Sequence, residues 1–302
     1  MERKGLYPAQ VRPAGTGQDG LPWTGQDGGV ATRIVYTDLD GTMVGPRGSF
    51  WHTADRRLTP TPAEALLELH RAGVALALVS GRTHAQLTEA ARIFAADGAI
   101  AELGSMVSWA GGRETHLLTG ALPAEFAGRT PISVMTELGV IEQLVAAHPG
   151  RLEWHEPWHT THSADALLRG RVDAAAVDVW LAERGWGWLT MNDNGAVPAS
   201  RRMTLDDDAL PPHVYHLMPR GISKGAAITW DLARRGLTAA DAVAVGDSVS
   251  DLEMAPAVGR LWVTANGAAV EGMGELLSAV PNVAVTEAPM GEGWAQAITA
   301  SL

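Results

Sequence analysis

The sequence predicts an α/β fold in which a doubly wound parallel sheet is interrupted by an inserted α+β domain. Strand-like and helix-like patterns alternate over residues 31–104, and the alternation returns over residues 213–302. Between them, residues 105–212 are irregular and rich in Trp and His. Strands that alternate with helices form parallel sheets with right-handed crossovers. We therefore expect the outer segments to form one core, the middle segment a separate domain, and residues 1–30 a flexible tail.

The composition excludes several classes of protein. The chain has 302 residues, of which 46% are hydrophobic, and its net charge is −11. Such an acidic chain lacks the basic surface that a general nucleic-acid binder needs. It contains no Cys, which excludes disulfides and thiolate chemistry. No run approaches the roughly 18 apolar residues of a membrane span, and we find no secretory signal, so we expect a cytoplasmic protein that binds neither nucleic acid nor membrane.

The first core segment has the pattern of three strands and two helices. Residues 33–37 form a β-branched, mostly apolar run typical of a buried strand. Thr61 is the expected N-cap of a helix that ends at Arg71, because Pro62 and Glu64 follow it. The remaining elements are expected to be a strand over 74–79, a helix over 84–96 and a strand over 99–104.

The rest of the chain contains further helical and strand-like patterns. In the inserted domain we expect helices over 133–147 and 169–184, and strands near 151–154, 187–192 and 214–218, the last on the return to the core. In the second core segment we expect helices over 225–235 and 251–257, strands over 242–245, 261–264 and 283–285, and a closing helix from about residue 292.

Two carboxylates follow the first strand. Asp38 and Asp40 are two residues apart, so on an extended chain their side chains point the same way. Two carboxylates this close are unfavourable unless a cation lies between them or one of them holds a proton. The pair therefore predicts a metal site, a nucleophile beside an acid/base, or both.

Other predicted strand ends carry matching polar groups. In open parallel sheets, ligands bind beyond the carboxyl ends of the strands. There the chain has Ser80, Asp247 with Asp251, and Asn266, and Lys224 stands just before the helix that re-enters the sheet. Carboxylates with phosphate oxygens are the ligands that Mg²⁺ takes in proteins. We therefore interpret the chain as a Mg²⁺-dependent phosphate-ester hydrolase.

Four motifs in order resemble those of the haloacid dehalogenase (HAD) superfamily of phosphatases. They are Asp38-Leu39-Asp40-Gly41-Thr42, Ser80-Gly81-Arg82, Lys224, and Gly246-Asp247-Ser248-Val249-Ser250-Asp251. The long insertion lies between the second and third motifs, where C2-type caps of this superfamily occur. The inserted domain loosely resembles the caps of the Cof-type, sucrose-phosphate phosphatase and mannosyl-3-phosphoglycerate phosphatase branches. The resemblance implies a HAD-like Rossmannoid core with a C2-type cap.

The resemblance also implies a role for each matched residue. Asp38 would be the nucleophile that forms an aspartyl-phosphate, and Asp40 the general acid/base. Two positions depart from the pattern, because Leu103 and Ser250 stand where many relatives have Asn. The implied Mg²⁺ ligands are Asp38, the backbone carbonyl of Asp40 and Asp247, with Asp251 as a further ligand or as a residue that supports the ligands. The implied phosphate-binding residues are Thr42, Ser80, Gly81, Lys224 and Asn266.

The inserted domain contains candidate substrate residues. Residues 155–159 match the H-E-x-x-H zinc pattern, but Pro157 disfavours the helix that this pattern requires, so we reject zinc proteolysis. Two interpretations stay open: these side chains form part of the substrate face of the inserted domain, or they are ordinary packing with solvated His. The candidate substrate residues are Arg82, Trp154, His155, Trp158 and His159, with His162 beside them.

The cap resemblance suggests a class of substrate. A sugar phosphate or phosphorylated glycoside, similar to mannosyl-3-phosphoglycerate or sucrose phosphate, is the first prediction for a small phosphorylated metabolite. Two alternatives stay open: a phosphomannomutase-like phosphosugar mutase and a non-catalytic phospholigand-binding protein. The expected assembly is a monomer or a homodimer.

Overall fold

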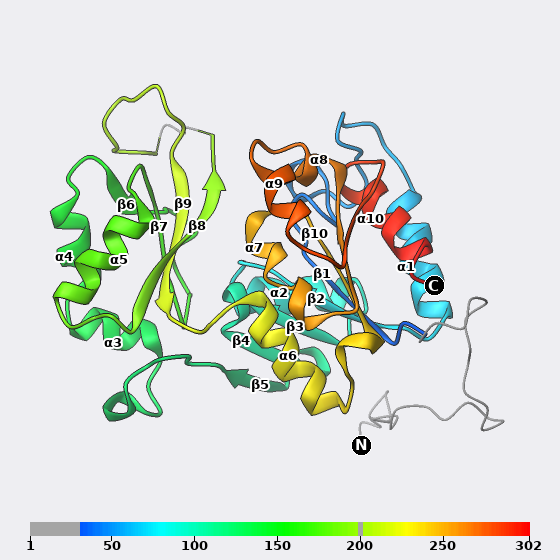
Figure 1. Cartoon of the computed structure of the whole chain (residues 1–302), viewed down its shortest axis with the longest axis horizontal. Helices are drawn as coiled ribbons and strands as arrows, with labels where there is room; N and C mark the ends of the chain where they lie inside the picture. The colour runs from blue at the N-terminus through cyan, green and yellow to red at the C-terminus, as the bar shows by residue number, and fades with distance from the viewer. Residues whose placement is uncertain (1–30, 199–201) are drawn as a thin grey trace, which may run out of the picture. The chain divides into compact units, whose positions relative to one another are not determined.

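The computed structural model describes residues 31–198 and 202–302, so the tail predicted over residues 1–30 lies outside the described residues. Residues 32–302 form one unit that contains two β-sheets. The larger sheet has the strand order β12-β11-β10-β1-β2-β3-β4-β5, and the smaller has the order β6-β7-β9-β8 (Figure 1). Within the described residues, no helix combines the length and hydropathy needed to span a membrane.

The parallel part of the larger sheet confirms the predicted fold class. Its central strand β1 (Ile34–Thr37) pairs in parallel with β2 on one side and β10 on the other. All four residues of β1 are buried, as expected for a strand covered on both faces. The other parallel strands are β2 (Ala75–Val79), β3 (Gly98–Ala101), β10 (Ala242–Gly246), β11 (Arg260–Val263) and β12 (Val283–Val285).

Helices cover both faces of this sheet. On one face, Val35 packs with α1, α2 and α10, and on the other face Ile34 and Tyr36 pack with α6. Thr61 is the first helical residue of α1 and Pro60 is its N-cap, so the predicted cap was one residue too late. The helices are α1 (Thr61–Arg71), α2 (His84–Ile93), α6 (Lys224–Arg235), α7 (Val249–Leu252), α8 (Ala265–Ala268), α9 (Met273–Ser278) and α10 (Met290–Thr299).

A hairpin extends the larger sheet beyond the predicted boundary of the core. Strands β4 (Met106–Trp109) and β5 (Glu114–Leu117) are antiparallel, and β4 pairs with β3. The indole of Trp109 donates to Asp231 of α6 at 2.6 Å. The prediction that the inserted domain begins at residue 105 was therefore wrong, because residues 106–117 continue the core sheet.

Residues 119–220, which we call the insertion, contain the smaller antiparallel sheet. Strand β9 lies inside this sheet, between β7 and β8, so the predicted return to the core at residue 213 was also wrong. The helix predicted over 133–147 is two helices, separated at Gly139, whose φ is +64°. The elements of the insertion are α3 (Pro131–Glu137), α4 (Val140–Ala147), β6 (Leu152–Trp154), β7 (Ala166–Gly170), α5 (Ala174–Glu183), β8 (Leu189–Ala196) and β9 (His213–Pro219).

The chain enters and leaves the insertion at one place. The amide of Ala121 donates to the carbonyl of Arg220 at 2.8 Å, so the two connecting segments lie side by side. A further contact joins the insertion to the core, since the buried carboxylate of Glu102 accepts the amides of Ser163 and Ala164 at 2.8 and 2.9 Å. These contacts hold the insertion next to the strand ends of the core.

Candidate active site

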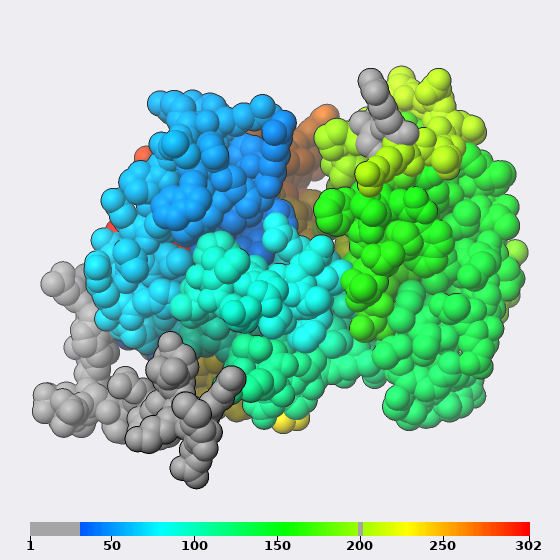
Figure 2. All heavy atoms as spheres, turned by 180° about the vertical axis from the view of Figure 1, so that it is seen from behind, coloured from blue at the N-terminus to red at the C-terminus, as the bar shows by residue number. Residues whose placement is uncertain are grey.

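A cavity of about 690 Å³ lies between the strand ends of the larger sheet and the insertion. Figure 2 shows a hollow where the blue surface of the core meets the green surface of the insertion. From the core, the lining residues include Asp38, Asp40, Ser80, Gly81, Arg82, Lys224 and Asp247. From the insertion they include His155, Trp158, His162, Leu167, Asn194, Val197, Val214 and His216.

The turn after β1 presents Asp38 to this cavity. Asp38 directly follows β1 and is almost fully buried, whereas about half of the Asp40 side chain is exposed. Gly41 has a φ of +88°, and a Cβ there would collide with the carboxylate of Asp247. Only glycine suits both the backbone conformation and the close approach. The glycine therefore lets the first motif lie directly against the fourth.

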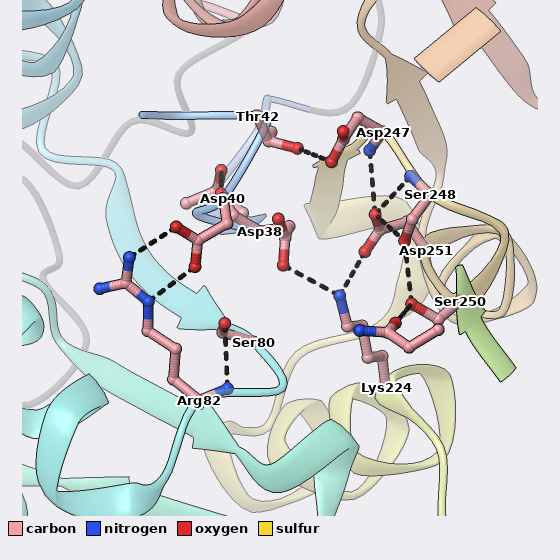
Figure 3. Close-up of polar contacts among 12 residues, drawn as sticks. Asp38, Asp40, Thr42, Ser80, Arg82, Lys224, Asp247, Ser248, Ser250 and Asp251 are labelled. Atoms are coloured by element: carbon pink, nitrogen blue, oxygen red, sulfur yellow. Dashed lines mark hydrogen bonds and ion pairs between the residues drawn. The ribbon is translucent and has the colours of Figure 1, made fainter. Parts of the chain in front are cut away.

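Lys224 lies between two buried carboxylates, as Figure 3 shows. Its Nζ donates to Asp38 Oδ1 at 3.0 Å and to Asp251 Oδ1 at 2.6 Å. Burial alone would lower the pKa of Lys224, but Asp251 and Asp38 raise that pKa above its usual value. The lysine is therefore a fixed cation at the start of α6, where the hydroxyl of Ser223 caps the helix by accepting the amide of Ala226.

Asp251 supports the loop after β10. Its Oδ2 accepts the amides of Asp247 and Ser248, both at 2.9 Å, and the hydroxyl of Ser248 at 2.8 Å. Burial would raise the pKa of Asp251, but Lys224 and these amides hold it below its ordinary range. With both oxygens engaged, Asp251 fits the second of its two predicted roles, supporting the ligands by positioning Lys224 and Asp247, better than the role of direct metal ligand.

Three carboxylates are close enough to share a cation. Oxygens of Asp38, Asp247 and Asp251 lie within 4.8 Å of one another. Burial, followed by the effect of Asp251, raises the pKa of Asp247 to about 7. Burial likewise raises the pKa of Asp38, although Lys224 opposes this rise. Buried carboxylates of this kind are stabilised by a divalent cation, and an all-oxygen donor set suits Mg²⁺.

Thr42 and Asn266 do not line the cavity found among the described residues, contrary to their predicted role in phosphate binding. The fully buried hydroxyl of Thr42 donates to Asp247 Oδ1 at 2.9 Å. The side-chain amide of Asn266 donates to Asp247 Oδ2 and to the carbonyl of Gly41, both at 3.0 Å. Both residues therefore orient the Asp247 carboxylate, and their groups are not free for a phosphate.

Arg82 forms a two-point ion pair with Asp40. Its Nε and one terminal nitrogen donate to the two carboxylate oxygens at 2.7 and 2.6 Å (Figure 3). Hydrogen bonding to Asp40 raises the pKa of Arg82 above its usual value. The arginine thus orients the side chain predicted to be the general acid/base, and it also lines the cavity beside Ser80 and Gly81.

The insertion contributes a different set of residues from the predicted one. His155 and Trp158 line the cavity, whereas Trp154 and His159 pack against each other with ring centroids 5.1 Å apart, outside the lining identified in the described chain. Burial, followed by the effect of Arg169, lowers the pKa of His155 to about 4, so this imidazole is neutral at pH 7. The stretch 155–159 lies in turns and not in a helix, as the rejection of the zinc motif requires.

Sequence reasoning missed two buried residues on this side of the cavity. His216, on the strand predicted near 214–218, lines the cavity and bonds to the fully buried Asp165. The two positions that depart from the resemblance also lie near the insertion. Ser250 is 3.4 Å from Asn194 of the insertion. Leu103 has a φ of +53°, a conformation that Asn adopts more readily than Leu.

Sequence comparisons find phosphatases, although no family model matches the chain. A stretch of 52 residues is 48% identical to phosphoglycolate phosphatase of Halobacterium salinarum, and it covers 17% of this chain and 23% of that protein. The chain thus matches only about a quarter of the length of those relatives. Phosphoglycolate phosphatase of Methanoculleus marisnigri is 26% identical over 273 residues, which cover 88% of this chain and 95% of the relative.

Solved structures with a similar arrangement decide the fold. One is described as a haloacid dehalogenase-like hydrolase from Bacteroides thetaiotaomicron, with a TM-score of 0.57 and 17% identity over 90% of this chain and 100% of that one. This chain has the haloacid dehalogenase fold. The same fold is found in sucrose-phosphatase of Synechocystis, solved with sucrose and phosphate, with a TM-score of 0.59 and 16% identity over 90% of this chain and 98% of that one. A HAD subclass IIB sugar phosphatase gives a TM-score of 0.57 and 16% identity over 89% and 98% of the two chains. The resemblance stated from the four motifs is confirmed at the level of the fold.

Proposed function

We propose that the protein is a Mg²⁺-dependent phosphoric monoester hydrolase that acts on a small phosphorylated metabolite. The observation that carries the proposal is the position of Asp38 in the cavity, 3.0 Å from the buried ammonium of Lys224 and beside the carboxylate of Asp247. Relatives and structural neighbours that are named phosphatases support the same activity.

Two carboxylates would divide the reaction between them. Asp38 would attack the phosphorus, and the ester P–O bond would break while Asp40 gives a proton to the leaving alkoxide. A water molecule would then attack the phosphorus of the aspartyl-phosphate, with Asp40 taking its proton, and phosphate would leave with Asp38 restored. Asp40 is the more exposed of the two and its carboxylate is oriented by Arg82, which suits a group that meets both the leaving alcohol and water.

Charge neutralisation supplies most of the catalysis in phosphoryl transfer. Lys224 and the hydroxyl of Ser80 line the cavity next to Asp38 and would hold phosphoryl oxygens. Asp38, Asp247 and the carbonyl of Asp40 would hold the cation, which when bound supplies positive charge to the phosphoryl group. Asp251, Thr42 and Asn266 would keep these ligands in position through the hydrogen bonds described above.

The substrate class is a separate prediction. The cap resemblance favours a sugar phosphate or phosphorylated glycoside, whereas the curated relatives are named for phosphoglycolate. The cavity, at about 690 Å³, has room for either. The cytoplasmic location and the monomeric or homodimeric state also remain predictions, and size-exclusion chromatography with light scattering would measure the second.

A phosphate-release assay tests the proposed function. Purified protein should release phosphate from p-nitrophenyl phosphate and from several natural esters when Mg²⁺ is present, and EDTA should stop the release. Folded protein that hydrolyses no ester in a broad panel would contradict the proposal and favour a phospholigand-binding protein. Conversion of one sugar phosphate into another without net phosphate release would favour a mutase.

A further inference from the structure

A buried carboxylate in the insertion is shared by two imidazoles. Asp165, immediately before β7, is fully buried, and its Oδ1 accepts from Nδ1 of His162 at 2.7 Å. Its Oδ2 accepts from Nδ1 of His216, on β9, at 2.5 Å. Both oxygens of Asp165 are thus occupied by ring nitrogens, and each ring is fixed in the tautomer or charge state that carries a proton on Nδ1. We call these three residues the His–Asp–His group.

The two imidazoles face the proposed active site. His162 and His216 line the same cavity as Asp38 and Ser80, although less than a tenth of either residue is exposed. A Cβ added to Gly81 would lie 3.4 Å from Nε2 of His216. Gly81 follows Ser80, which is proposed to hold the phosphoryl group. A substituent close to the ester oxygen of a bound substrate would therefore meet Nε2 of His216.

The charges around the group favour an anionic partner. A carboxylate at Nε2 of His216 requires a proton on that nitrogen as well as on Nδ1, and with His162 also protonated and Asp165 ionised the three residues then carry a net charge of +1. Burial would raise the pKa of Asp165, but His216 and His162 lower it. Burial would lower the pKa of His162, but the bond to Asp165 raises it. Burial, followed by the effect of Asp165, raises the pKa of the nearby Glu102, whose carboxylate accepts the amides of Ser163 and Ala164.

The neighbouring wall of the cavity offers few partners for a sugar. Beside His216 on β9 and its partner strand β7, the lining includes the apolar side chains of Val214 and Leu167. The insertion's other nitrogen-bearing side chains among the lining residues that the structure describes are the neutral His155, the indole of Trp158 and the amide of Asn194. Several sugar hydroxyls would be left unpaired against such a surface. A single carboxylate needs only one or two charged donors, which the His–Asp–His group can supply.

We infer that the His–Asp–His group is a subsite for a carboxylate on the substrate. The preferred substrates are then phosphate esters of short hydroxy acids, with the phosphoryl group at Asp38 and the carboxylate at Nε2 of His216. His216 determines this specificity by contact with the substrate. Asp165, which holds the His216 ring, and His162, which also bonds to the backbone of Trp158, are positioning residues. The inference rests on the phosphatase function proposed above and narrows its substrate class.

A matched pair of substrates tests the subsite. 3-Phosphoglycerate and glycerol 3-phosphate differ chiefly in a carboxylate in place of a hydroxymethyl group, and 2-phosphoglycolate with 2-hydroxyethyl phosphate forms a shorter pair. The wild-type protein should show a kcat/KM about 10-fold or more higher for the acid of each pair, as expected for one charge-assisted hydrogen bond. His216→Asn should reduce this preference ratio by about 10-fold.

A second His–Asp pair on the same strand supplies the control. His213 of β9 is partly exposed, its Nδ1 lies 2.7 Å from Asp193, and it does not line the cavity identified among the described residues. His213→Asn should therefore keep the wild-type preference ratio. A fall of similar size in both variants would mean that the sheet, and not the subsite, was damaged, and would overturn the inference.

Binding measurements separate the subsite from the chemistry. In Asp38→Asn protein with Mg²⁺, calorimetry should give a Kd about 10-fold lower for 3-phosphoglycerate than for glycerol 3-phosphate. Equal kcat/KM and equal affinity within both pairs would overturn the subsite while leaving the phosphatase function intact. If neither these esters nor p-nitrophenyl phosphate were hydrolysed, the proposed function would fail, and the affinity comparison would still decide the subsite. Neither comparison requires a variant of His216 to fold.

Discussion

The two sides of the cavity use opposite arrangements of charge. On the core side, one cation lies between two carboxylates, because Lys224 bonds to both Asp38 and Asp251. On the insertion side, one carboxylate lies between two imidazoles, because Asp165 bonds to both His162 and His216. All six of these side chains are buried.

This difference in charge determines which kind of ligand each side of the cavity can bind. The core side has an excess of negative charge and is incomplete without a cation, which would then help to bind a phosphoryl group. The insertion side has a surplus of proton donors. A substrate that joined a phosphate to a second anion would match both sides at once.

The largest expected effect comes from removing the proposed nucleophile. Asp38→Asn keeps the shape of the side chain but lacks a carboxylate for attack, so kcat should fall by at least about 10³-fold. Circular dichroism should show an unchanged fold. Turnover close to that of the wild-type protein would remove Asp38 from the role of nucleophile.

Breaking the core side should cost the most stability. Lys224→Met leaves Asp38 and Asp251 buried without their cation, which should lower the free energy of unfolding by about 3–5 kcal/mol at neutral pH. Urea denaturation measures this change. Arg92→Met is the control, because Arg92 and Glu89 form an exposed ion pair whose loss costs about 1 kcal/mol or less. Similar losses of stability in both variants would contradict the claim that Lys224 stabilises the buried carboxylates of Asp38 and Asp251.

Breaking the insertion side should have a smaller effect on stability. Asp165→Asn removes a buried charge-assisted acceptor, and the free energy of unfolding should fall by about 1–3 kcal/mol. Because Asp165 raises the pKa of His162, that pKa should also fall in the variant, as measured by NMR titration. Asp193→Asn, at the partly exposed pair with His213, should leave the His162 titration as it is. An unchanged His162 pKa in Asp165→Asn would contradict the interaction between the His162 ring and the Asp165 carboxylate.

A pH series tests whether the core side of the cavity binds a divalent cation. Asp247 has a pKa raised from 3.8 to about 7 in the folded protein, so from pH 4 to 7 the folded state holds a proton that the unfolded state has lost. Without a divalent cation, this group therefore lowers stability as the pH rises through that window. Mg²⁺ competes with this proton, so its affinity should be about 20-fold weaker at pH 5.5 than at pH 7.5. Calorimetry measures the affinity, and a pH-independent value would contradict the raised pKa.

The core side was largely predictable from the sequence because a parallel sheet brings the carboxyl ends of its strands to one edge. The residues after β1, β2 and β10 are distant in sequence but meet at one edge, so Asp38, Ser80 and Asp247 could be assigned to one site. What the motifs did not reveal is which way each side chain turns. Thr42 and Asn266 were expected to face phosphate, yet they bond to Asp247, a contact that depends on the path of two loops.

The insertion side was much less predictable. His216 meets Asp165 because β9 pairs with β7, in a register that sets Leu167 opposite His216. Strand β7 was not predicted, since its residues were partly assigned to a helix, and without it no spacing connects residues 165 and 216. The hairpin of β4 and β5 was missed for a similar reason, because only its pairing with β3 assigns it to the core.

The adjacent entry and exit of the insertion have a consequence for engineering. Because the amide of Ala121 bonds to the carbonyl of Arg220, the two ends of residues 121–220 can be cut and rejoined at a single point. An insertion from another protein of this fold could be grafted there while the residues of the proposed phosphoryl chemistry, all outside that range, stayed as they are. Such a chimera would show whether the insertion determines the substrate while the core carries out the reaction.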